Sequence, residues 1–334
     1  MRNNFKENLR TISLFSGIGG LDLGFIESGY KLIWANEMDK HAVQAYKANI
    51  DKNIIEGDIL DLYKEIPEND VLLAGFPCQP FSMMGKQKGF EDERGTLFFT
   101  IQKIIELHQN KPKVIVLENV KNLLTHQKGQ TFAKMKEILE TLGYEVHSEV
   151  LDTKDYGLPQ TRRRVFVVCF LKSFLEGSST KFTFPEPKPL KLTMYDLLDE
   201  EVEKKYFLSE KILPTILSNG SGNYYSKSEI DLEIARPLTA TMHKMHRASQ
   251  DNYYTDNKNR SRFKDEINKP ISNIRRITPN ECRKLQGFPD KWKFVVSDTQ
   301  SYRQFGNAVS VNVSRALALR IKEYIGMINN EKHS

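Results

Sequence analysis

The first half of the chain alternates short, continuously apolar runs with segments of helical period. Runs that stay apolar and rich in β-branched residues predict strands covered on both faces, as in a parallel sheet, and the amphipathic segments between them predict helices. The predicted strands are residues 11–15, 31–35, 71–74 and 114–117, and the predicted helices are residues 21–28, 40–49, 97–109 and 131–142. This succession predicts an α/β fold with a doubly wound, mostly parallel, Rossmann-like sheet.

The pattern changes in the second half. Two more strands are predicted at residues 144–151 and 164–170, and residues 173–271 are then polar and rich in turn formers, without a sustained helical period. Helical patterns return at residues 279–285 and 310–327, and the second is expected to pack back onto the first lobe. We predict a catalytic and cofactor-binding domain at 1–172, a smaller loop-rich recognition domain at 173–271, a hinge and return segment at 272–300, and a segment at 301–334 that completes the catalytic domain.

Composition narrows the class of protein. Hydrophobic residues make up 39% and charged residues 28% of the 334 residues, which is typical of a globular protein. No apolar run approaches the roughly 20 residues needed to cross a bilayer, and the N-terminus lacks the apolar part of a secretory signal, so a cytoplasmic protein without membrane contact is expected. The three cysteines, Cys78, Cys169 and Cys282, are widely spaced. This spacing argues against disulfides and against a zinc site, and no metal is expected.

The positive charge is concentrated in the second half. The formal net charge is +6, and residues 236–293 carry 14 Lys and Arg against 6 Asp and Glu. A basic region of this kind suits a polyphosphate partner such as a nucleic acid. A solvated, lysine-rich surface gives the same pattern, so the charge needs a chemical motif beside it.

A glycine-rich turn follows the first predicted strand. Residues 15–20 read Phe-Ser-Gly-Ile-Gly-Gly and lead into a helix. Such a turn lets the backbone approach a ligand and points N–H groups at it, which indicates a nucleoside-bearing cofactor. A dinucleotide loop or an ordinary tight turn would look the same. Two acidic residues favour the cofactor. Glu37 ends the second predicted strand, where carboxylates commonly hold a ribose, and Asp58 ends a further likely strand before residues 71–74.

The segment after the predicted strand at residues 71–74 is the most informative. From Gly75 to Ser82 it reads Gly-Phe-Pro-Cys-Gln-Pro-Phe-Ser and lies at the carboxyl edge of the sheet, where such folds bind ligands. Most cysteines are small buried hydrophobes, and we keep that interpretation for Cys169 and Cys282. Cys78 lies between two prolines in a loop, which packing explains poorly. Glu118 ends the next predicted strand at the same edge, and a thiol beside a carboxyl group suits covalent catalysis with an acid partner.

An arginine run precedes the last predicted strand of the first domain. Residues 160–165 read Gln-Thr-Arg-Arg-Arg-Val. Guanidinium groups at this point could clamp a phosphate or a base carbonyl. A solvated basic turn is the alternative.

Together these segments resemble the ordered motifs of the DNA cytosine-5 methyltransferases, in particular the bacterial type II restriction-modification enzymes. The resemblance rests on residues 15–20, 75–82, 118–120 and 160–164 and on the Gln-Phe-Gly-Asn-Ala-Val stretch at 304–309, with residues 275–279 and 283–289 similar to the motif before the last. The motifs stand in family order from about residue 11 to residue 312. Only the middle of the second lobe is unmatched.

The resemblance implies transfer of a methyl group from S-adenosylmethionine to carbon 5 of a cytosine in double-stranded DNA. Cys78 would add to carbon 6, and Glu118 would hydrogen-bond to ring nitrogen 3 and help to protonate it. Arg162 and Arg164 would hold the base and its flanking phosphate. The cytosine must leave the helix, because carbon 6 is attacked perpendicular to a ring face that stacking covers. The base that removes the hydrogen of carbon 5 is not identifiable from the sequence, and water is one candidate.

The resemblance also implies two sets of binding residues. The cofactor-binding set is Phe15, Ser16, Gly17, Gly19, Gly20, Glu37, Met38, Asp58, Ile59, Gly75, Pro77, Asn307, Ala308 and Val309. Residues 236–241 resemble the threonine-leucine element of target-recognition regions. The DNA-binding set is Gln79, Ser82, Arg94, Arg163, Arg236, Thr239, Thr241, His243, Lys244, Arg247, Gln250 and Tyr253, some of which must be scaffold. The recognition sequence itself is not predicted.

Three other functions account for part of the sequence. A nicotinamide or flavin oxidoreductase explains the glycine turn and Glu37 but gives no role to residues 77–79. Methylation of cytosine in RNA fits the same fold, although the long second lobe favours a duplex-reading enzyme. A DNA-binding protein without activity would not need Cys78, Glu118 and Arg162 intact. We expect a monomer that works beside a restriction endonuclease of the same system.

Overall fold

The computed structural model describes residues 9–77, 97–221, 224–263 and 271–332. The chain forms two compact units. Unit 1 consists of Met1–Asp152, Arg163–Glu186 and Val313–Ser334, and unit 2 consists of Thr153–Arg162 and Pro187–Asn312. The short segment that ends in Arg162 therefore belongs to unit 2, although β7 of unit 1 begins at the next residue.

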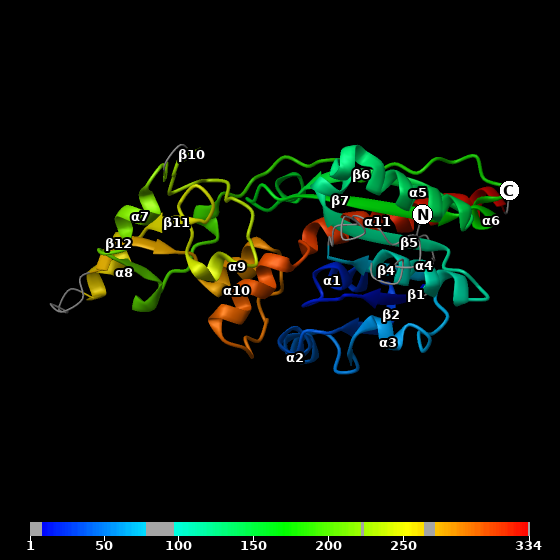
Figure 1. Cartoon of the computed structure of the whole chain (residues 1–334), viewed down its shortest axis with the longest axis horizontal. Coiled ribbons are helices and arrows are strands. Elements are labelled where there is room, and N and C mark those ends of the chain that lie inside the picture. The colour runs from blue at the N-terminus through cyan, green and yellow to red at the C-terminus, as the bar shows by residue number, and fades with distance from the viewer. Residues whose placement is uncertain (1–8, 78–96, 222–223, 264–270, 333–334) are drawn as a thin grey trace, which may run out of the picture. The chain divides into compact units, whose positions relative to one another are not determined.

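Unit 1 is built on a seven-stranded sheet in the order β3-β2-β1-β4-β5-β7-β6 (Figure 1). The strands are β1 Arg10–Leu14, β2 Lys31–Glu37, β3 Ile55–Glu56, β4 Val71–Gly75, β5 Val114–Val120, β6 Tyr144–Asp152 and β7 Arg163–Leu171. All pairings among β1 to β5 are parallel, and β7 is antiparallel to both β5 and β6. The mostly parallel α/β sheet predicted from the sequence is confirmed. The strand order reverses between β1 and β4, and such a switch point is where these sheets bind ligands.

The helices of unit 1 connect these strands. They are α1 Gly20–Glu27, α2 Lys40–Asn49, α3 Ile59–Leu62, α4 Leu97–Leu107, α5 Gln130–Thr141, α6 Lys172–Leu175 and the long α11 Val311–Lys332, whose first two residues belong to unit 2. Single 3-10 turns lie at Lys121–Leu124, His126–Gly129 and Thr153–Tyr156, the last of them in unit 2. The core contains residues from β1, β4, β5 and β7 packed against α4 and α5. Their near-continuous apolar runs are those of strands covered on both faces.

Helix α11 packs closely against α1 within unit 1. A Cβ atom added at Gly24 would lie 2.4 Å from the backbone nitrogen of Arg315, so only glycine allows this approach. The Tyr30 hydroxyl donates a hydrogen bond of 3.0 Å to the carbonyl of Ala318. The C-terminal helix is thereby joined to α1 and to the residue just before β2.

Unit 2 contains a small antiparallel sheet and short helices. Its strands are β8 Phe207–Ser209, β11 Tyr253–Thr255 and β12 Ile271–Arg276, with a separate pair β9 Gly220–Ser221 and β10 Tyr224–Tyr225. Its helices are α7 Leu213–Leu217, α8 Asn257–Arg260, α9 Pro279–Leu285 and α10 Asp298–Asn307, with 3-10 turns at Met194–Asp196, Lys204–Tyr206, Met242–Lys244 and Ser261–Phe263. A cluster of buried apolar residues, among them Leu208, Ile216 and Ile274, forms its core.

A buried ion pair joins β12 to α9. The Arg275 guanidinium donates to both carboxylate oxygens of Glu281, at 2.8 and 2.9 Å, and to Asp256 at 2.8 Å. Arg275 and Glu281 are each at most 1% exposed. Glu281 also accepts the Thr278 N–H in a capping box that begins α9. A bidentate pair whose remaining acceptors are used in this way is well suited to burial.

Over the described ranges, no helix is both long and apolar enough to span a bilayer. The same ranges hold no group of three or more His, Cys, Asp and Glu side chains placed to bind a metal ion.

Candidate active site

The glycine-rich turn after β1 has an unusual backbone. Phe15 has a φ of 56°, Gly17 of 57° and Gly19 of 82°, all in the left-handed region. Glycine adopts this region at little cost, whereas Phe15 does not and must be held by its surroundings. The turn is fixed to the neighbouring strand by a 2.9 Å hydrogen bond from the Ser16 N–H to the carbonyl of Asn36.

Glu37 links the ends of three strands through its carboxylate and its backbone carbonyl. One oxygen accepts the Gly17 N–H at 2.9 Å, and the other accepts the backbone N–H groups of Met38 and Asp39 at 2.9 and 2.8 Å. The Glu37 carbonyl accepts the Gly57 N–H at 3.1 Å. The structure therefore brings together the predicted cofactor residues that follow β1, β2 and β3.

These residues leave room for a nucleoside cofactor. No heavy atom lies within 4 Å of a Cβ added at Gly17, so the turn is open on that side. Met38 is 68% exposed beside Glu37. The Glu37 carboxylate accepts three backbone N–H groups, which leaves one of its roughly four acceptor sites for a hydroxyl group. Ile59 is 2% exposed and packs in the core, so its side chain is not available to a ligand, and Asp58 caps α3 through Leu60. The arrangement fits a ribose at Glu37.

Beneath the turn lies a buried polar network that the sequence did not reveal. The Asp22 carboxylate on α1 accepts hydrogen bonds from Ser13 and Tyr46, each at 2.7 Å, and the Ser16 hydroxyl donates to Ser13 at 2.9 Å. Tyr46 also lies under Gly19, where an added Cβ would be 2.9 Å from its ring. Burial raises the pKa of Asp22 to about 6, and the hydrogen bonds from Ser13 and Tyr46 oppose the rise.

Asp22 should make stability depend on pH in an unusual direction. Its pKa is about 6 when folded and 3.8 when unfolded, so the native state holds the proton more tightly. The contribution of Asp22 to the free energy of unfolding therefore decreases as pH rises from 4 to 7, by about 3 kcal/mol for a shift of this size. Urea unfolding of the unmodified chain and of Asp22→Asn across this range should show that difference between the two curves. Parallel curves would exclude the assignment.

The second cluster of unit 1 surrounds Glu118. Gly75 and Glu118 are register partners on β4 and β5, and a Glu118 carboxylate oxygen lies 3.5 Å from where a Gly75 Cβ would be. Asn119 donates a 2.9 Å hydrogen bond to the carbonyl of Phe76. Asn119, to which the sequence assigned no role, thus fixes the chain just before Pro77. Cys78 and the predicted DNA contacts Gln79, Ser82 and Arg94 lie outside the described residues.

Arg164 faces the same carboxylate. Its Nε lies 3.3 Å from a Glu118 oxygen, and the two side chains are 22% and 10% exposed. Burial lowers the pKa of the Arg164 guanidinium, and the Glu118 charge counters this, so the group stays protonated at neutral pH. A carboxylate beside a fixed cation at a strand end can bind a polar ring edge and a phosphate.

The other two arginines of the run have different surroundings. Arg163 pairs with Asp152 at 3.0 Å and has a 53% exposed side chain. Arg162 is 2% exposed and donates to three backbone carbonyls of unit 2. These contacts favour an anchoring role for Arg162, and the predicted contact with the base stays untested. The predicted cofactor residues Asn307 to Val309 also belong to unit 2, at the end of α10.

The predicted DNA-reading residues of unit 2 divide into exposed and internal side chains. Tyr253 is 1% exposed in the core and donates to the carbonyl of His246, and Arg236 donates to the carbonyl of Ala248. Arg247 is half-buried and bonds the Ser218 hydroxyl at 2.8 Å. These internal contacts favour structural roles for Tyr253, Arg236 and Arg247 over direct contacts with DNA. The more exposed candidates are Thr241, Lys244 and Gln250, with Thr239 and His243 half-buried.

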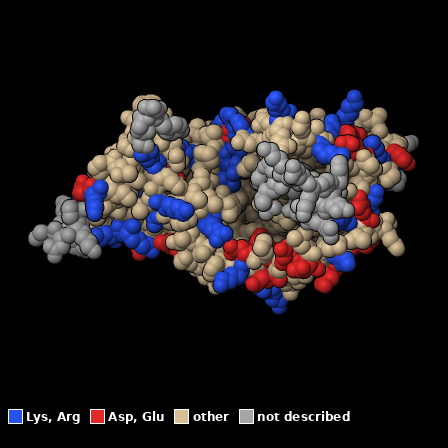
Figure 2. Space-filling model, viewed as in Figure 1, with Lys and Arg blue, Asp and Glu red and all other residues tan. Residues whose placement is uncertain are grey.

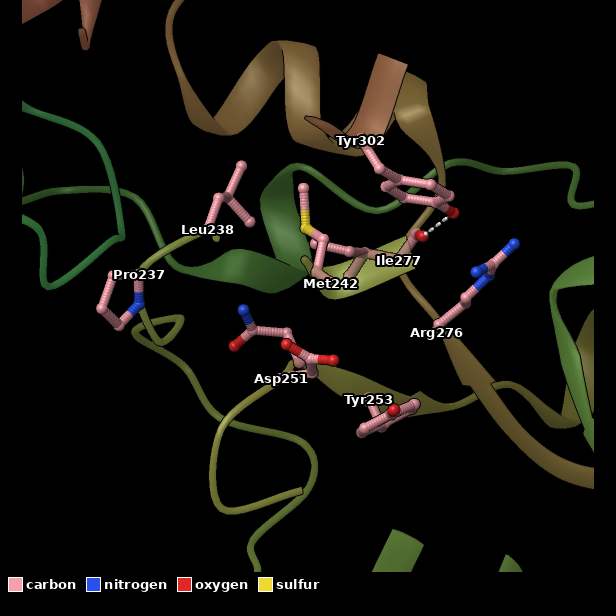
Figure 3. Close-up of a pocket in the computed structure, with 9 residues that line it drawn as sticks. Pro237, Leu238, Met242, Asp251, Tyr253, Arg276, Ile277 and Tyr302 are labelled. Carbon is pink, nitrogen blue, oxygen red and sulfur yellow. Dashed lines mark hydrogen bonds between the residues drawn. The ribbon is translucent and has the colours of Figure 1, made fainter. Parts of the chain in front are cut away.

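Basic side chains gather over unit 2 on the face shown in Figure 2, and acidic ones gather over α2 and α3 of unit 1. A pocket of unit 2 lies beside residues 236–241, here called the threonine-leucine segment (Figure 3). It is lined by Pro237, Leu238, Met242, Asp251, Asn252, Tyr253, Arg276, Ile277 and Tyr302. The Arg276 guanidinium lies 4.6 Å from the ring centroid of Tyr302. Arg276 is the last residue of β12 and belongs to the motif at residues 275–279, to which the sequence assigned no role.

Comparison with known proteins agrees with this arrangement. The family model for C-5 cytosine-specific DNA methylases matches residues 9–323. The type II methyltransferase M.HpaII of Haemophilus parainfluenzae is 39% identical over 97% of this chain and 92% of its own. M.DsaV of Dactylococcopsis salina is 38% identical over 98% and 90%. The crystal structure of the S. pombe Dnmt2 methyltransferase superposes with a TM-score of 0.73 at 21% identity, over 94% of this chain and 99% of that one, which shows a shared fold.

The sheet, the glycine turn and Glu37 define a nucleoside-cofactor fold of the methyltransferase type. The chain belongs to the family of C-5 cytosine-specific DNA methylases. It is a DNA cytosine-5 methyltransferase that uses S-adenosylmethionine. The family resemblance stated from the sequence is thereby confirmed, and the oxidoreductase alternative is wrong.

Proposed function

We propose that the chain methylates carbon 5 of a flipped-out cytosine within a specific sequence of double-stranded DNA, with Cys78 as nucleophile and Glu118 as its acid partner. The supporting observation is the position of the Glu118 carboxylate, 3.5 Å from the Cβ site of Gly75, three residues before Cys78. Arg164, paired with that carboxylate, is suited to hold the base or its flanking phosphate.

The proposed reaction passes through a covalent bond between Cys78 and the cytosine ring. The Cys78 thiolate forms a bond from sulfur to carbon 6, and the electron pair of the 5,6 double bond moves into the ring. Glu118 supports that charge by a hydrogen bond or proton at ring nitrogen 3. Bound S-adenosylmethionine would supply an electrophilic methyl group. Carbon 5 takes this group as its bond to sulfur breaks, and S-adenosylhomocysteine leaves with that electron pair. Water or another base then takes the proton from carbon 5, the 5,6 double bond is restored, and the thiolate leaves carbon 6.

Further roles are proposed for residues near Glu37 and for residues of unit 2. Glu37 would hold the ribose hydroxyls, the turn from Phe15 to Gly20 would contact the methionine part, and Asp58 would lie near the adenine. Asn307, Ala308 and Val309 are proposed to complete the cofactor site. In unit 2, the exposed side chains among residues 236–250 would read the DNA, since polar and basic groups of this kind contact phosphates and base edges.

The names of the relatives support a biological setting. M.HpaII and M.DsaV are named as type II methyltransferases. We infer that this chain likewise protects DNA in a restriction-modification system, in the cytoplasm, beside a cognate endonuclease. It would act as a monomer, because the two strands of a palindromic site can be methylated in separate visits.

Bisulfite sequencing of a plasmid that expresses the chain tests the proposal. Cytosines that resist bisulfite conversion should appear in nearly every copy of one recurring sequence, and cytosines elsewhere should be converted. A plasmid without 5-methylcytosine would contradict the proposal. Transfer of tritium from labelled S-adenosylmethionine to transfer RNA but not to duplex DNA would favour the RNA alternative.

A further inference from the structure

Arg162 lies at a buried polar junction of unit 2. Its guanidinium donates to the carbonyl of Leu238 at 2.8 Å, of Gly306 at 3.1 Å and of Ala308 at 2.9 Å. These carbonyls come from the threonine-leucine segment and from the end of α10. One planar cation therefore bridges two segments that lie about 70 residues apart in the sequence.

Gln160 completes the same junction. Its side-chain oxygen accepts the Leu238 N–H at 3.0 Å, and its side-chain nitrogen donates to the carbonyl of Leu285 at 3.1 Å. The backbone of this segment also pairs with Ala235, through hydrogen bonds of 3.0 Å from Thr161 and 2.7 Å to Pro159. Gln160 is fully buried. The backbone of Leu238 is thus held at both of its polar groups, the N–H by Gln160 and the carbonyl by Arg162.

The contact with α10 leaves no space for a side chain. A Cβ added at Gly306 would lie 2.2 Å from the carbonyl carbon and oxygen of Thr239 and 2.5 Å from the nitrogen of Ala240. These atoms are backbone and cannot move aside by a rotamer change. Gly306 therefore allows the segment to rest directly on the helix.

We infer that Arg162 is a positioning residue, which fixes Leu238, Thr239 and Ala240 on the end of α10 and so sets the geometry of target recognition. A fork of N–H donors in one plane can satisfy carbonyls from two segments, which a lysine ammonium on a flexible stem does less well. Leu238 lines the pocket beside Asp251 and Arg276 (Figure 3), so a shift of the segment would displace the surface around it. The inference rests on the proposed reading of DNA by residues 236–250.

Three variants test it, with duplexes that carry the mapped site or the same site with one base pair changed. Gly306→Ala introduces a steric clash with the Thr239 backbone without altering charge. Arg162→Lys keeps the positive charge but loses the planar set of N–H donors, and Arg162→Met removes both. Thr299→Ala, at an exposed position of α10, is the matched control. Melting temperature and S-adenosylmethionine affinity are measured for each variant beside the steady-state constants.

Gly306→Ala and Arg162→Lys should show the same defect. We expect the preference in kcat/KM for the correct duplex over the altered one to decrease by about tenfold, in the range of a single base-pair mismatch. The control should keep its preference. In Arg162→Met, the slope of log affinity for DNA against log salt should be unchanged, because the guanidinium faces carbonyls and not a phosphate.

Two results would overturn the inference. A salt slope smaller by about one in Arg162→Met, with normal discrimination in Gly306→Ala, would show that Arg162 contacts a phosphate. A lowered melting temperature with unchanged discrimination in Gly306→Ala and Arg162→Lys would show that the junction only holds the fold. If the unmodified chain does not methylate DNA at all, the proposed function fails first, and the two failures are thus distinguishable.

Discussion

Replacing Cys78 by serine should lower methyl transfer to DNA by at least about 10³-fold, or about 4 kcal/mol in the activation free energy. The attacking species is a thiolate, and a serine hydroxyl is far less ionised and less nucleophilic toward carbon 6. DNA binding should survive, because the substitution exchanges one sulfur atom for oxygen and adds no charge. Single-turnover transfer of tritium and a filter-binding titration measure the two quantities.

The other two cysteines provide a matched control for Cys78→Ser. Cys169 and Cys282 are fully buried, and burial raises the pKa of each thiol above its usual value. Neither is therefore suited to act as a thiolate. Cys169→Ala and Cys282→Ala should keep the rate per folded molecule. A Cys78→Ser enzyme with a rate close to the original would refute covalent catalysis at this residue.

Replacing Glu118 by glutamine should lower the single-turnover rate by about 10²-fold to 10⁴-fold, the usual contribution of a positioned acid. An amide can still hydrogen-bond to the ring, but it cannot supply a proton to nitrogen 3. The loss should appear in the rate at saturating DNA more than in DNA affinity. Rapid-quench measurement with excess enzyme separates the two effects.

Glu140→Gln is the control for Glu118→Gln, since Glu140 is an exposed residue of α5. It should behave like the unmodified enzyme. If Glu118→Gln also retained a rate within about threefold of the original, the carboxylate could not act as the acid partner, and the role of Arg164 beside it would need another explanation.

Much of the fold of unit 1 was predictable because its signals are local. The apolar runs of β1, β4 and β5 report burial on both faces, and the helix at 40–49 was predicted with its exact bounds. Helix α10 was not predicted, because its sequence is polar and ends in Gly-Asn. Its glycine lies against the backbone of residues 239 and 240, a long-range contact with no local signature.

The candidate site was likewise predictable where its signals are local and unpredictable where they depend on long-range packing. Glu37 ends β2 as predicted, whereas β5 continues two residues beyond Glu118. Both positions were close to correct because topology alone brings the carboxyl ends of neighbouring parallel strands to one edge. The burial of Tyr253 and the contacts of Arg162 depend on which distant segments pack on them, and neither periodicity nor composition encodes that. Residue type indicated chemistry, whereas only the packing separates a DNA contact from a scaffold residue.

The proposed covalent step can be trapped directly. A duplex with 5-fluorocytosine at the mapped target, incubated with the chain and S-adenosylmethionine, should yield a complex that survives denaturing electrophoresis, because fluorine cannot leave carbon 5 as a proton does. Mass spectrometry of the digested complex should find the modified base on the peptide that contains Cys78. A chain that methylates ordinary DNA but forms no such complex, or forms it at another residue, would contradict the proposed mechanism.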